Sequence, residues 1–365
     1  MERIRYGAEY AGGGYPLDRL LTPVFWASNL VAGFAVSVEL GRNVRVAGIT
    51  AARLILRRPW LALRKILRRF EKRLKRRRPV EGRTPLSCTA CIIVKDEVTY
   101  LLEWIAYYEI IGFDRIICYD NNSSDGTTNI LLSLANIGRI DYVSWPNVPG
   151  VVPQAAAYRD ALTRISTEWV AFLDIDEFLL LKSHLCMTDF LRSFSPTVGG
   201  IAVNWKIFGS SGHRTRTQGL VIERFTKCAN LDHGRYENSE YGFGWQIKSI
   251  ARLGAIERVD YHSHVLEEPF SYVNAVGQGY VERSICYEGA QVNHYAVKSW
   301  EEFLEKTKKS RVNFTPEKNA QNEYWEHSEY FDAYDLNSLD DVSMLRYVEM
   351  VNKRVVDLKR ILGIV

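Results

Sequence analysis

The chain has 365 residues, of which 47% are hydrophobic, 12% aromatic and 25% charged. This composition excludes a wholly disordered chain, a collagen-like repeat and a disulfide-stapled miniprotein, and a mean hydropathy of −0.18 argues against a polytopic membrane protein. The net charge of +4 is unevenly distributed, because residues 42–83 carry 16 Lys and Arg against two acids, whereas residues 84–365 carry 28 against 37. We therefore predict a basic arm that faces an anionic partner and a mildly acidic globular part.

The arm, residues 1–85, contains an uncharged stretch at residues 20–38. This length is borderline for a membrane span, and Pro23 and Asn29 weaken its hydrophobic character. A cleavable signal peptide is not expected, because residues 1–19 have no net positive charge.

A basic amphipathic helix is predicted after Pro59, where apolar residues recur at intervals of three and four. These residues are Trp60, Leu63, Leu67, Phe70 and Leu74. Lys and Arg fill the other face, so residues 42–83 are predicted to bind an anionic membrane surface. Docking of this helix on the globular part, or its self-association, is the second interpretation, and binding of nucleic acid is disfavoured. We expect the protein on the cytoplasmic face of a membrane, held peripherally or by a single N-terminal anchor.

Short apolar strands then alternate with helical periods. We predict strands at residues 91–94, 115–119, 140–145 and 169–173, and helices at 98–108, 128–135 and 155–165. This order is typical of an α/β fold with a mainly parallel sheet and helices on both faces. The apolar spacing between Met344 and Leu362 predicts a C-terminal helix, and His262 and His264 are placed on one face of a further strand.

The six cysteines are dispersed, and only Cys88 and Cys91 form a CxxC pair. No second pair stands at the spacing of a zinc site, and Cys91 opens an apolar run. We interpret these cysteines as small buried hydrophobic residues.

Three carboxylates, Asp174, Asp176 and Glu177, follow the strand predicted at residues 169–173. Like charges this close repel unless a cation neutralises them. A hard divalent cation takes such oxygen ligands and can also bind a diphosphate. A solvated strand end or the first turn of a helix is the alternative.

The polar loop at residues 120–127 follows the second strand and is either a simple turn or part of a nucleoside pocket. Neither GxGxxG nor GxxxxGK[ST] occurs in the chain, which disfavours a dinucleotide site and a phosphate-loop ATPase.

Three segments together resemble the glycosyltransferase family 2-like and family 92-like enzymes. They are residues 92–97 before Trp104, the loop at 119–127 and the segment at 169–178. The resemblance covers roughly residues 88–312. It continues through residues 203–213 and 248–250, residues 293–295, Lys298, Ser299, Phe303 and Lys306.

This resemblance implies a GT-A fold, a nucleotide-sugar donor and a Mn²⁺ or Mg²⁺ ion on the DxD motif. The chain would then consist of the arm at residues 1–85, a GT-A domain at 86–312 and a helical C-terminal extension at 313–365. The expected fold is a GT-A-like α/β sheet flanked by helices.

Site residues follow by position from the same resemblance. Asp176 would bind the metal directly, Asp174 would contact the ribose or the metal through water, and His294 would be a further ligand of the metal or the diphosphate. The other donor-site residues would be Lys95, Glu97, Asp120, Asn122 and Lys248. Acceptor-side residues would be Trp205, His213 and Trp245, and the candidate general bases are Glu177, Asp232, Glu237 and Glu240.

The expected function is that of a metal-dependent hexosyltransferase. The favoured donor is a UDP-hexose, and the acceptor is a glycan or glycolipid. Transfer is expected to invert the configuration at the transferred carbon. One alternative is a non-enzymatic adaptor that binds a membrane or nucleic acid. The other is a sugar nucleotidyltransferase, which would need a Gly-rich first loop where residues 94–97 stand.

Overall fold

The computed structural model describes residues 86–230, 243–321 and 328–364. All of these residues belong to one compact unit of the chain, residues 79–365. The predicted basic arm therefore lies outside the described residues. Among the helices that are described, none combines the length and the apolar character needed to cross a bilayer.

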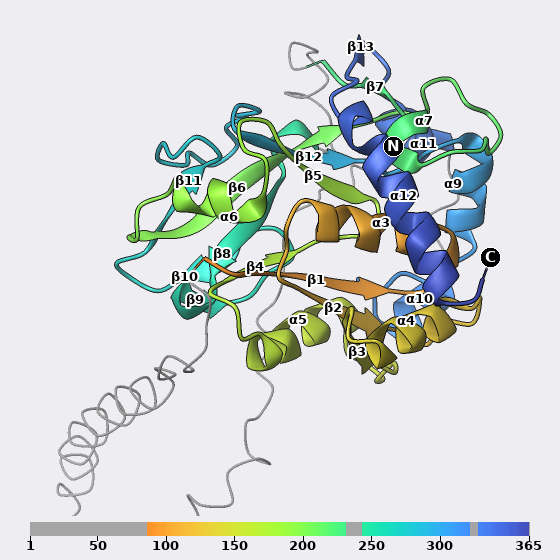
Figure 1. Ribbon diagram of the computed structural model, residues 1–365, viewed down its shortest axis with the longest axis horizontal. Helices are drawn as coiled ribbons and strands as arrows, with labels where there is room; N and C mark the ends of the chain where they lie inside the picture. The colour runs from red at the N-terminus through yellow and green to blue at the C-terminus, as the bar shows by residue number, and fades with distance from the viewer. Residues whose placement is uncertain (1–85, 231–242, 322–327, 365) are drawn as a thin grey trace, which may run out of the picture. The chain divides into compact units, whose positions relative to one another are not determined.

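Strands and helices alternate in the first half of this unit, as the sequence predicts (Figure 1). The elements are β1 (Cys88–Val94), α3 (Val98–Ile110), β2 (Arg115–Asp120), α4 (Thr127–Asn136), β3 (Asp141–Ser144), α5 (Pro153–Arg164) and β4 (Trp169–Phe172). β1 pairs in parallel with both β2 and β4, and β2 pairs in parallel with β3. The carboxyl ends of these strands therefore meet at one edge of the sheet.

Further strands extend the sheet beyond β4. They are β5 (Glu177–Leu181), β6 (Val198–Ile207), β8 (Ile247–Arg252), β11 (Ser271–Asn274) and β12 (Ala290–His294). The strand order is β3-β2-β1-β4-β8-β6-β12-β5, and β11 pairs with β6. β8 runs antiparallel to β4 and β6, and β12 is parallel to β6 but antiparallel to β5. The predicted α/β class, with a mainly parallel sheet and helices on both faces, is confirmed.

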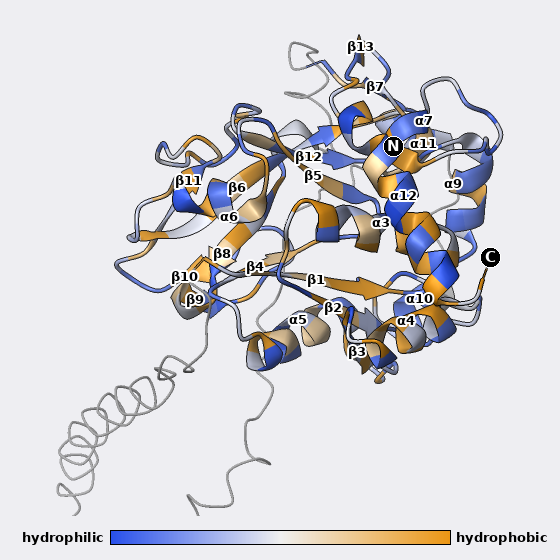
Figure 2. Ribbon diagram, in the orientation of Figure 1, coloured by the Kyte–Doolittle hydropathy of each residue, from blue (hydrophilic) through white to orange (hydrophobic). Residues whose placement is uncertain are grey.

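Two hydrophobic cores cover opposite faces of the central strands. Along β1, Ala90 and Ile92 enter the core that contains α3, whereas Cys91 and Ile93 enter the core that contains α5. This alternation follows from the period of two along a strand. Because β1 is buried on both faces, it is apolar except for Thr89 (Figure 2).

The predicted C-terminal helix is confirmed as α12 (Leu345–Ile361), which packs against α3. It buries Tyr347, Val351 and Leu358 in the same core as α3, and its exposed side mixes hydrophilic residues with apolar ones such as Met350 and Val356 (Figure 2). The predicted boundary at residue 312 stays a prediction.

Shorter elements connect these parts. They are α6 (Met187–Arg192), α7 (Val221–Arg224), β7 (Lys227–Cys228), η1 (Phe243–Trp245), η2 (Leu253–Ala255), β9 (Ile256–Arg258), β10 (Val265–Leu266), α9 (Trp300–Thr307), α10 (Pro316–Gln321), α11 (Ser328–Tyr334) and β13 (Leu339–Asp340).

The prediction of a strand through His262 and His264 is wrong, because His262 lies in a bend and His264 in the irregular residue between that bend and β10. The bend is closed locally by the backbone N–H of Asp260, which donates to His264 Nδ1 at 3.2 Å.

Candidate active site

The three acidic residues after β4 form a tight turn that leads into β5. The backbone N–H of Asp174 donates to Glu177 Oε2 at 2.8 Å, and the N–H of Glu177 donates to the carbonyl of Asp174 at 3.1 Å. Glu177 is completely buried and Asp176 nearly so, whereas the side chain of Asp174 is 33% exposed. The turn thus leaves Asp174 as the most accessible of the three carboxylates.

Lys248 on β8 neutralises two of these carboxylates from within the sheet. Its Nζ lies 2.8 Å from Asp174 Oδ2 and 3.3 Å from Glu177 Oε2. Burial alone would lower the pKa of Lys248, but the two carboxylates outweigh it and raise that pKa above its ordinary value. Burial also raises the pKa of Glu177, to about 8, against the opposing effect of Lys248.

Lys306 on α9 is the partner of the third carboxylate. Its Nζ lies 2.7 Å from Asp176 Oδ2 and donates to the carbonyl of Ala296 at 2.8 Å. Burial would raise the pKa of Asp176, but nearby positive charge, chiefly that of Lys306, holds it well below its usual range. α9 begins with a capping box between Ser299 and Glu302, which fixes where the helix starts and so places Lys306 in its last turn.

Lys298 is a third ammonium in this cluster and is almost completely buried. Its Nζ donates to the carbonyl of Tyr295 at 3.3 Å and lies 4.4 Å from the centre of the Tyr100 ring. Burial lowers the pKa of Lys298 to about 8, although Asp176 opposes that shift. Its φ of +57° is a left-handed conformation that non-glycine residues rarely adopt. Such strain is concentrated at functional sites.

An aromatic wall borders the cluster on the side of β6 and β12. The Trp205 ring lies between two imidazoles, with centroids 4.2 Å from His294 and 5.0 Å from His262. His294 Nε2 is 3.7 Å from Asp176 Oδ1. Burial lowers the pKa of His294 to about 4, so its ring is neutral at pH 7 and has the form required of a ligand.

Glu97 links the end of β1 to the same cluster. Its carboxylate lies 3.2 Å from Lys309 Nζ. Burial raises the pKa of Glu97, while Lys309, Lys298 and Lys306 act in the opposite direction. Predicted site residues from the ends of β1, β4, β8 and β12 therefore share one electrostatic environment.

Polar residues at the ends of β1 and β2 shape the predicted nucleoside loop. The carboxylate of Asp120 accepts from the backbone N–H of Ser123 at 3.1 Å and from Thr128 Oγ1 at 2.5 Å. Lys95 Nζ donates to the carbonyl of Asn122 at 2.8 Å. These contacts fix the loop beside the acidic turn, and the nucleoside-binding role of these residues stays a prediction.

The acceptor-side predictions fall in different places. Trp205 belongs to the aromatic wall, whereas Trp245 stacks with Arg283 at 5.2 Å. The ring of His213 contacts the carbonyl of Arg224 at 3.2 Å. Among its described contacts there is none with the acidic turn. The base candidates Asp232, Glu237 and Glu240 lie outside the described residues.

A divalent cation would find two carboxylates and one imidazole here, those of Asp174, Asp176 and His294. His294 Nδ1 is buried without a hydrogen-bond partner among the described residues. Over that same part of the chain, no three acidic, His or Cys side chains, these three included, are grouped so that they could hold a metal ion by themselves. Mg²⁺-type ions commonly use one or two carboxylates together with water and substrate phosphates. A cation held by one or two of these carboxylates would therefore have to take its remaining ligands from water or from the phosphates of a substrate.

Other contacts were not predicted by sequence reasoning. Gln154 at the start of α5 donates to Asp174 Oδ1 at 3.0 Å, and no local pattern links these two positions. Lys298 and Lys306 belong to the segments that carry the family resemblance, but only the structure assigns them to Asp176. The sequence also did not predict that each DxD carboxylate has a lysine partner.

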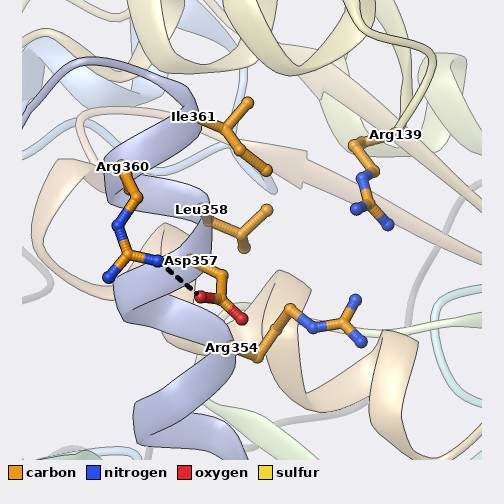
Figure 3. A pocket seen from close by; sticks show the side chains of 6 residues that line it. All are labelled: Arg139, Arg354, Asp357, Leu358, Arg360 and Ile361. Carbon is orange, nitrogen blue, oxygen red and sulfur yellow. Dashed lines mark hydrogen bonds and ion pairs between the residues drawn. The ribbon is translucent and has the colours of Figure 1, made fainter.

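A cavity of about 350 Å³ lies elsewhere, between α12 and the loop that follows α4 (Figure 3). Its lining residues are Arg139, Arg354, Asp357, Leu358, Arg360 and Ile361. Its arginines already have carboxylate partners: Arg354 and Arg139 lie 2.6 Å and 3.7 Å from Glu109, and Arg360 lies 3.1 Å from Asp357. None of the predicted site residues lines this cavity, so it is not part of the candidate active site.

The family model for glycosyltransferase family 92 matches residues 84–335. A family 92 protein of Oryza sativa subsp. japonica is 31% identical over 229 residues, which are 60% of this chain and 35% of that protein. One from Ricinus communis is 29% identical over 234 residues, which are 62% of this chain and 38% of the relative. The chain thus spans little more than a third of the length of these relatives.

Two solved structures show a weaker likeness. Residues 1–349 of S. aureus TarS align with a TM-score of 0.31 and 14% identity, over 46% of this chain and 48% of that one. Glucosyl-3-phosphoglycerate synthase from Mycobacterium tuberculosis, solved with Mn²⁺, UDP-glucose and phosphoglyceric acid, aligns with a TM-score of 0.27 and 15% identity, over 48% of this chain and 58% of that one. Both TM-scores are below 0.5, so neither likeness bears on function.

Proposed function

Because the chain belongs to glycosyltransferase family 92, we propose that it is a metal-dependent glycosyltransferase with a nucleotide-sugar donor. The observation that carries the proposal is the convergence of three carboxylates and three ammonium groups where β4 ends. These groups are Asp174, Asp176, Glu177, Lys248, Lys298 and Lys306. We further propose UDP-hexose as the donor, a glycan or lipid-linked acceptor, and inversion at the transferred carbon.

In this proposal some residues hold the cation and others stabilise the leaving group. Asp176 and Asp174 would hold the cation, with His294 beside them, and the cation supplies positive charge that offsets the charge on the leaving diphosphate. Lys306 and Lys298 add positive charge next to Asp176 in a largely buried setting, where charge is poorly screened.

Lys248 has a different task, because its ammonium is fixed between Asp174 and Glu177. It orients the Asp174 carboxylate and also contacts the buried carboxyl group of Glu177, at 3.3 Å. The hydrogen bond from Gln154 to the other oxygen of Asp174 restrains that carboxylate from the opposite side.

Inversion requires a carboxylate that removes the proton of the acceptor hydroxyl. Glu177 is poorly placed for this role, since it is fully buried and its Oε2 is engaged by Asp174 and Lys248. Asp232, Glu237 and Glu240 remain the candidate bases.

The basic segment at residues 42–83 is proposed to hold the protein on the cytoplasmic face of an anionic membrane. Deletion of residues 1–85 should abolish co-sedimentation with vesicles that contain phosphatidylserine, while donor hydrolysis continues. Equal sedimentation of the shortened and full-length proteins would contradict this role.

One observation favours a second function. Both DxD aspartates already have lysine partners, as expected of a degenerate domain that serves as a non-enzymatic adaptor. Such an adaptor would bind no nucleotide in a metal-dependent manner, which separates the two proposals.

Turnover of nucleotide sugars tests the proposed activity. The full-length protein would be incubated with a panel of UDP- and GDP-sugars in Mn²⁺ or in EDTA, and nucleotide release would be measured. We expect metal-dependent release from a UDP-hexose, and loss of release in Asp176→Asn. Asp341→Asn is the matched control, because Asp341 is also a buried aspartate 2.7 Å from a lysine. Absence of release from every donor, or equal release in Asp176→Asn, would contradict the proposal.

A further inference from the structure

We propose that the cavity between α12 and the loop after α4 binds a phosphorylated ligand, with the guanidinium groups of Arg139 and Arg354 on its phosphoryl group (Figure 3). The ligand class is a phosphate monoester of a sugar or polyol, either free in solution or as the headgroup of a lipid. No candidate active-site residue lines this cavity, so the inference does not depend on the proposed glycosyltransferase activity.

The first argument is that two guanidinium groups from separate elements meet at one carboxylate. Arg354 on α12 lies 2.6 Å from Glu109 Oε2, and Arg139 in the loop after α4 lies 3.7 Å from Glu109 Oε1. Glu109 itself belongs to α3. One carboxylate therefore faces two guanidinium groups, which leaves one positive charge in excess. An anion that bound between the two arginines would balance that charge.

The other charged residues of the cavity do not cancel this excess. Arg360 pairs with Asp357 at 3.1 Å, which is one guanidinium for one carboxylate. The cavity lining together with Glu109 therefore carries a net charge of one positive unit, located at Arg139 and Arg354.

The second argument is the supply of hydrogen-bond donors. A guanidinium has five N–H donors in a planar fork that matches the oxygens of a phosphoryl group. Arg354 uses its Nη1 for the hydrogen bond to Glu109. Over the described residues the side chain of Arg139 makes no hydrogen bond, because 3.7 Å to Glu109 is too long for one. These two side chains are 40% and 35% exposed, so their remaining donors face water that a phosphate can replace.

The third argument is the size and lining of the cavity. Its volume of about 350 Å³ lies within the range of small-molecule sites. Leu358 and Ile361 add apolar surface beside the arginines (Figure 3). Guanidinium groups next to apolar side chains suit a ligand that has both a phosphoryl group and a carbon skeleton. A long polyanion such as a nucleic acid would need a more extended basic surface.

Calorimetric titration of the full-length chain with inorganic phosphate and with glucose 6-phosphate, both in EDTA, tests for a free ligand. One variant, Arg139→Gln, removes a guanidinium that makes no hydrogen bond. The other, Arg354→Lys, keeps a positive charge beside Glu109 but loses the planar fork. Arg192→Gln is the matched control, because Arg192 is an exposed arginine that pairs with Asp189 outside the cavity. Thermal unfolding without ligand establishes that each variant is folded.

Co-sedimentation with vesicles tests for a lipid headgroup. The vesicles contain phosphatidylcholine and phosphatidylserine, with or without phosphatidylinositol 4-phosphate. The basic residues 42–83 are present in every variant, so their contribution is the same throughout. The quantity of interest is the difference between Arg139→Gln and the unmodified protein in the gain that the phosphoinositide produces.

We expect the unmodified protein to bind a free phosphate saturably, or to gain affinity for vesicles when the phosphoinositide is added. Arg139→Gln and Arg354→Lys should weaken that binding about tenfold, because each loses a charge-assisted contact. The free ligand should also raise the midpoint of thermal unfolding, and by less in these variants. Arg192→Gln should match the unmodified protein. Arg139→Gln should leave the affinity for UDP in Mn²⁺ unchanged.

Effects on the free phosphates alone would assign a soluble ligand, and effects on the vesicles alone a lipid headgroup, and both results support the site. Absence of binding to every probe, or equal binding by Arg139→Gln and the unmodified protein, would overturn the inference. An equal loss of UDP affinity in Arg139→Gln would overturn it too. If the unmodified protein binds a phosphate at this cavity but no UDP with any divalent metal, only the proposed function fails.

Discussion

The carboxylate of Glu177 accepts a hydrogen bond at 2.8 Å from the backbone N–H of Asp174, and this contact closes the acidic turn after β4. Glu177, which the sequence presents as a candidate base, therefore has a structural role: it fixes the conformation of the neighbouring DxD motif. Because Lys248 contacts the same carboxylate oxygen, the turn, β5 and β8 are joined by one buried ion cluster.

Replacement of Lys248 by Met should destabilise the fold. It would leave Asp174 and the buried Glu177 without their cation, and removal of one partner from a buried ion pair costs about 3–5 kcal/mol. Chemical denaturation measures this loss as a lower transition midpoint. Lys227→Met is the control, since Lys227 pairs with Asp340 at the surface and should cost less than about 1 kcal/mol. Equal stabilities of the two variants would contradict the assigned role of Lys248.

Leu358→Ala should show that α12 is integral to the domain. Leu358 is fully buried in the core shared with α3, and a Leu-to-Ala change in such a position costs about 2–5 kcal/mol. Val356, on the same helix, is 45% exposed, so Val356→Ala should change the free energy of unfolding by less than about 0.5 kcal/mol. If Leu358→Ala is as mild as its control, α12 does not pack as described.

Acidification should destabilise the protein in part through His264. Burial lowers the pKa of His264 to about 4, so between pH 6.5 and pH 4 the unfolded chain binds more protons at this residue than the folded chain. The contribution of His264 is thus intact above pH 6.5 and is lost as the pH falls, by up to about 3 kcal/mol.

Urea denaturation of the unmodified protein and of His264→Gln at about pH 7 and about pH 4.5 isolates this effect. The variant should lose less stability on acidification, because its side chain does not titrate in this range. Identical losses in both proteins would show that the folded state tolerates a charged His264.

Local sequence patterns predicted most of the first half of the fold. The apolar run of β1 and the helical spacing of α3 and α12 are set by neighbours within a few residues, so they can be read along the chain. His262 and His264 show the limit of that reading, because a side-chain contact with the backbone of Asp260 outweighs the alternating pattern.

The candidate site could be predicted only in part. The acidic turn is contiguous in sequence, but Lys248 lies 74 residues from Asp174, and Lys306 lies 130 residues from Asp176. Such pairs depend on strand order and on where α9 begins, neither of which is encoded near the DxD motif. The resemblance marked these lysines, but it did not assign them to particular carboxylates.

The central claim is that Asp176 is part of a site for a metal-bound nucleotide, and calorimetric titration of UDP tests it most directly. The unmodified protein would be titrated in Mn²⁺ and in EDTA, beside Asp176→Asn and the control Asp341→Asn. We predict saturable binding by the unmodified protein and by Asp341→Asn in Mn²⁺ only, and binding at least tenfold weaker in Asp176→Asn. Equal binding of UDP in Mn²⁺ and in EDTA, or by Asp176→Asn and the unmodified protein, would contradict the account.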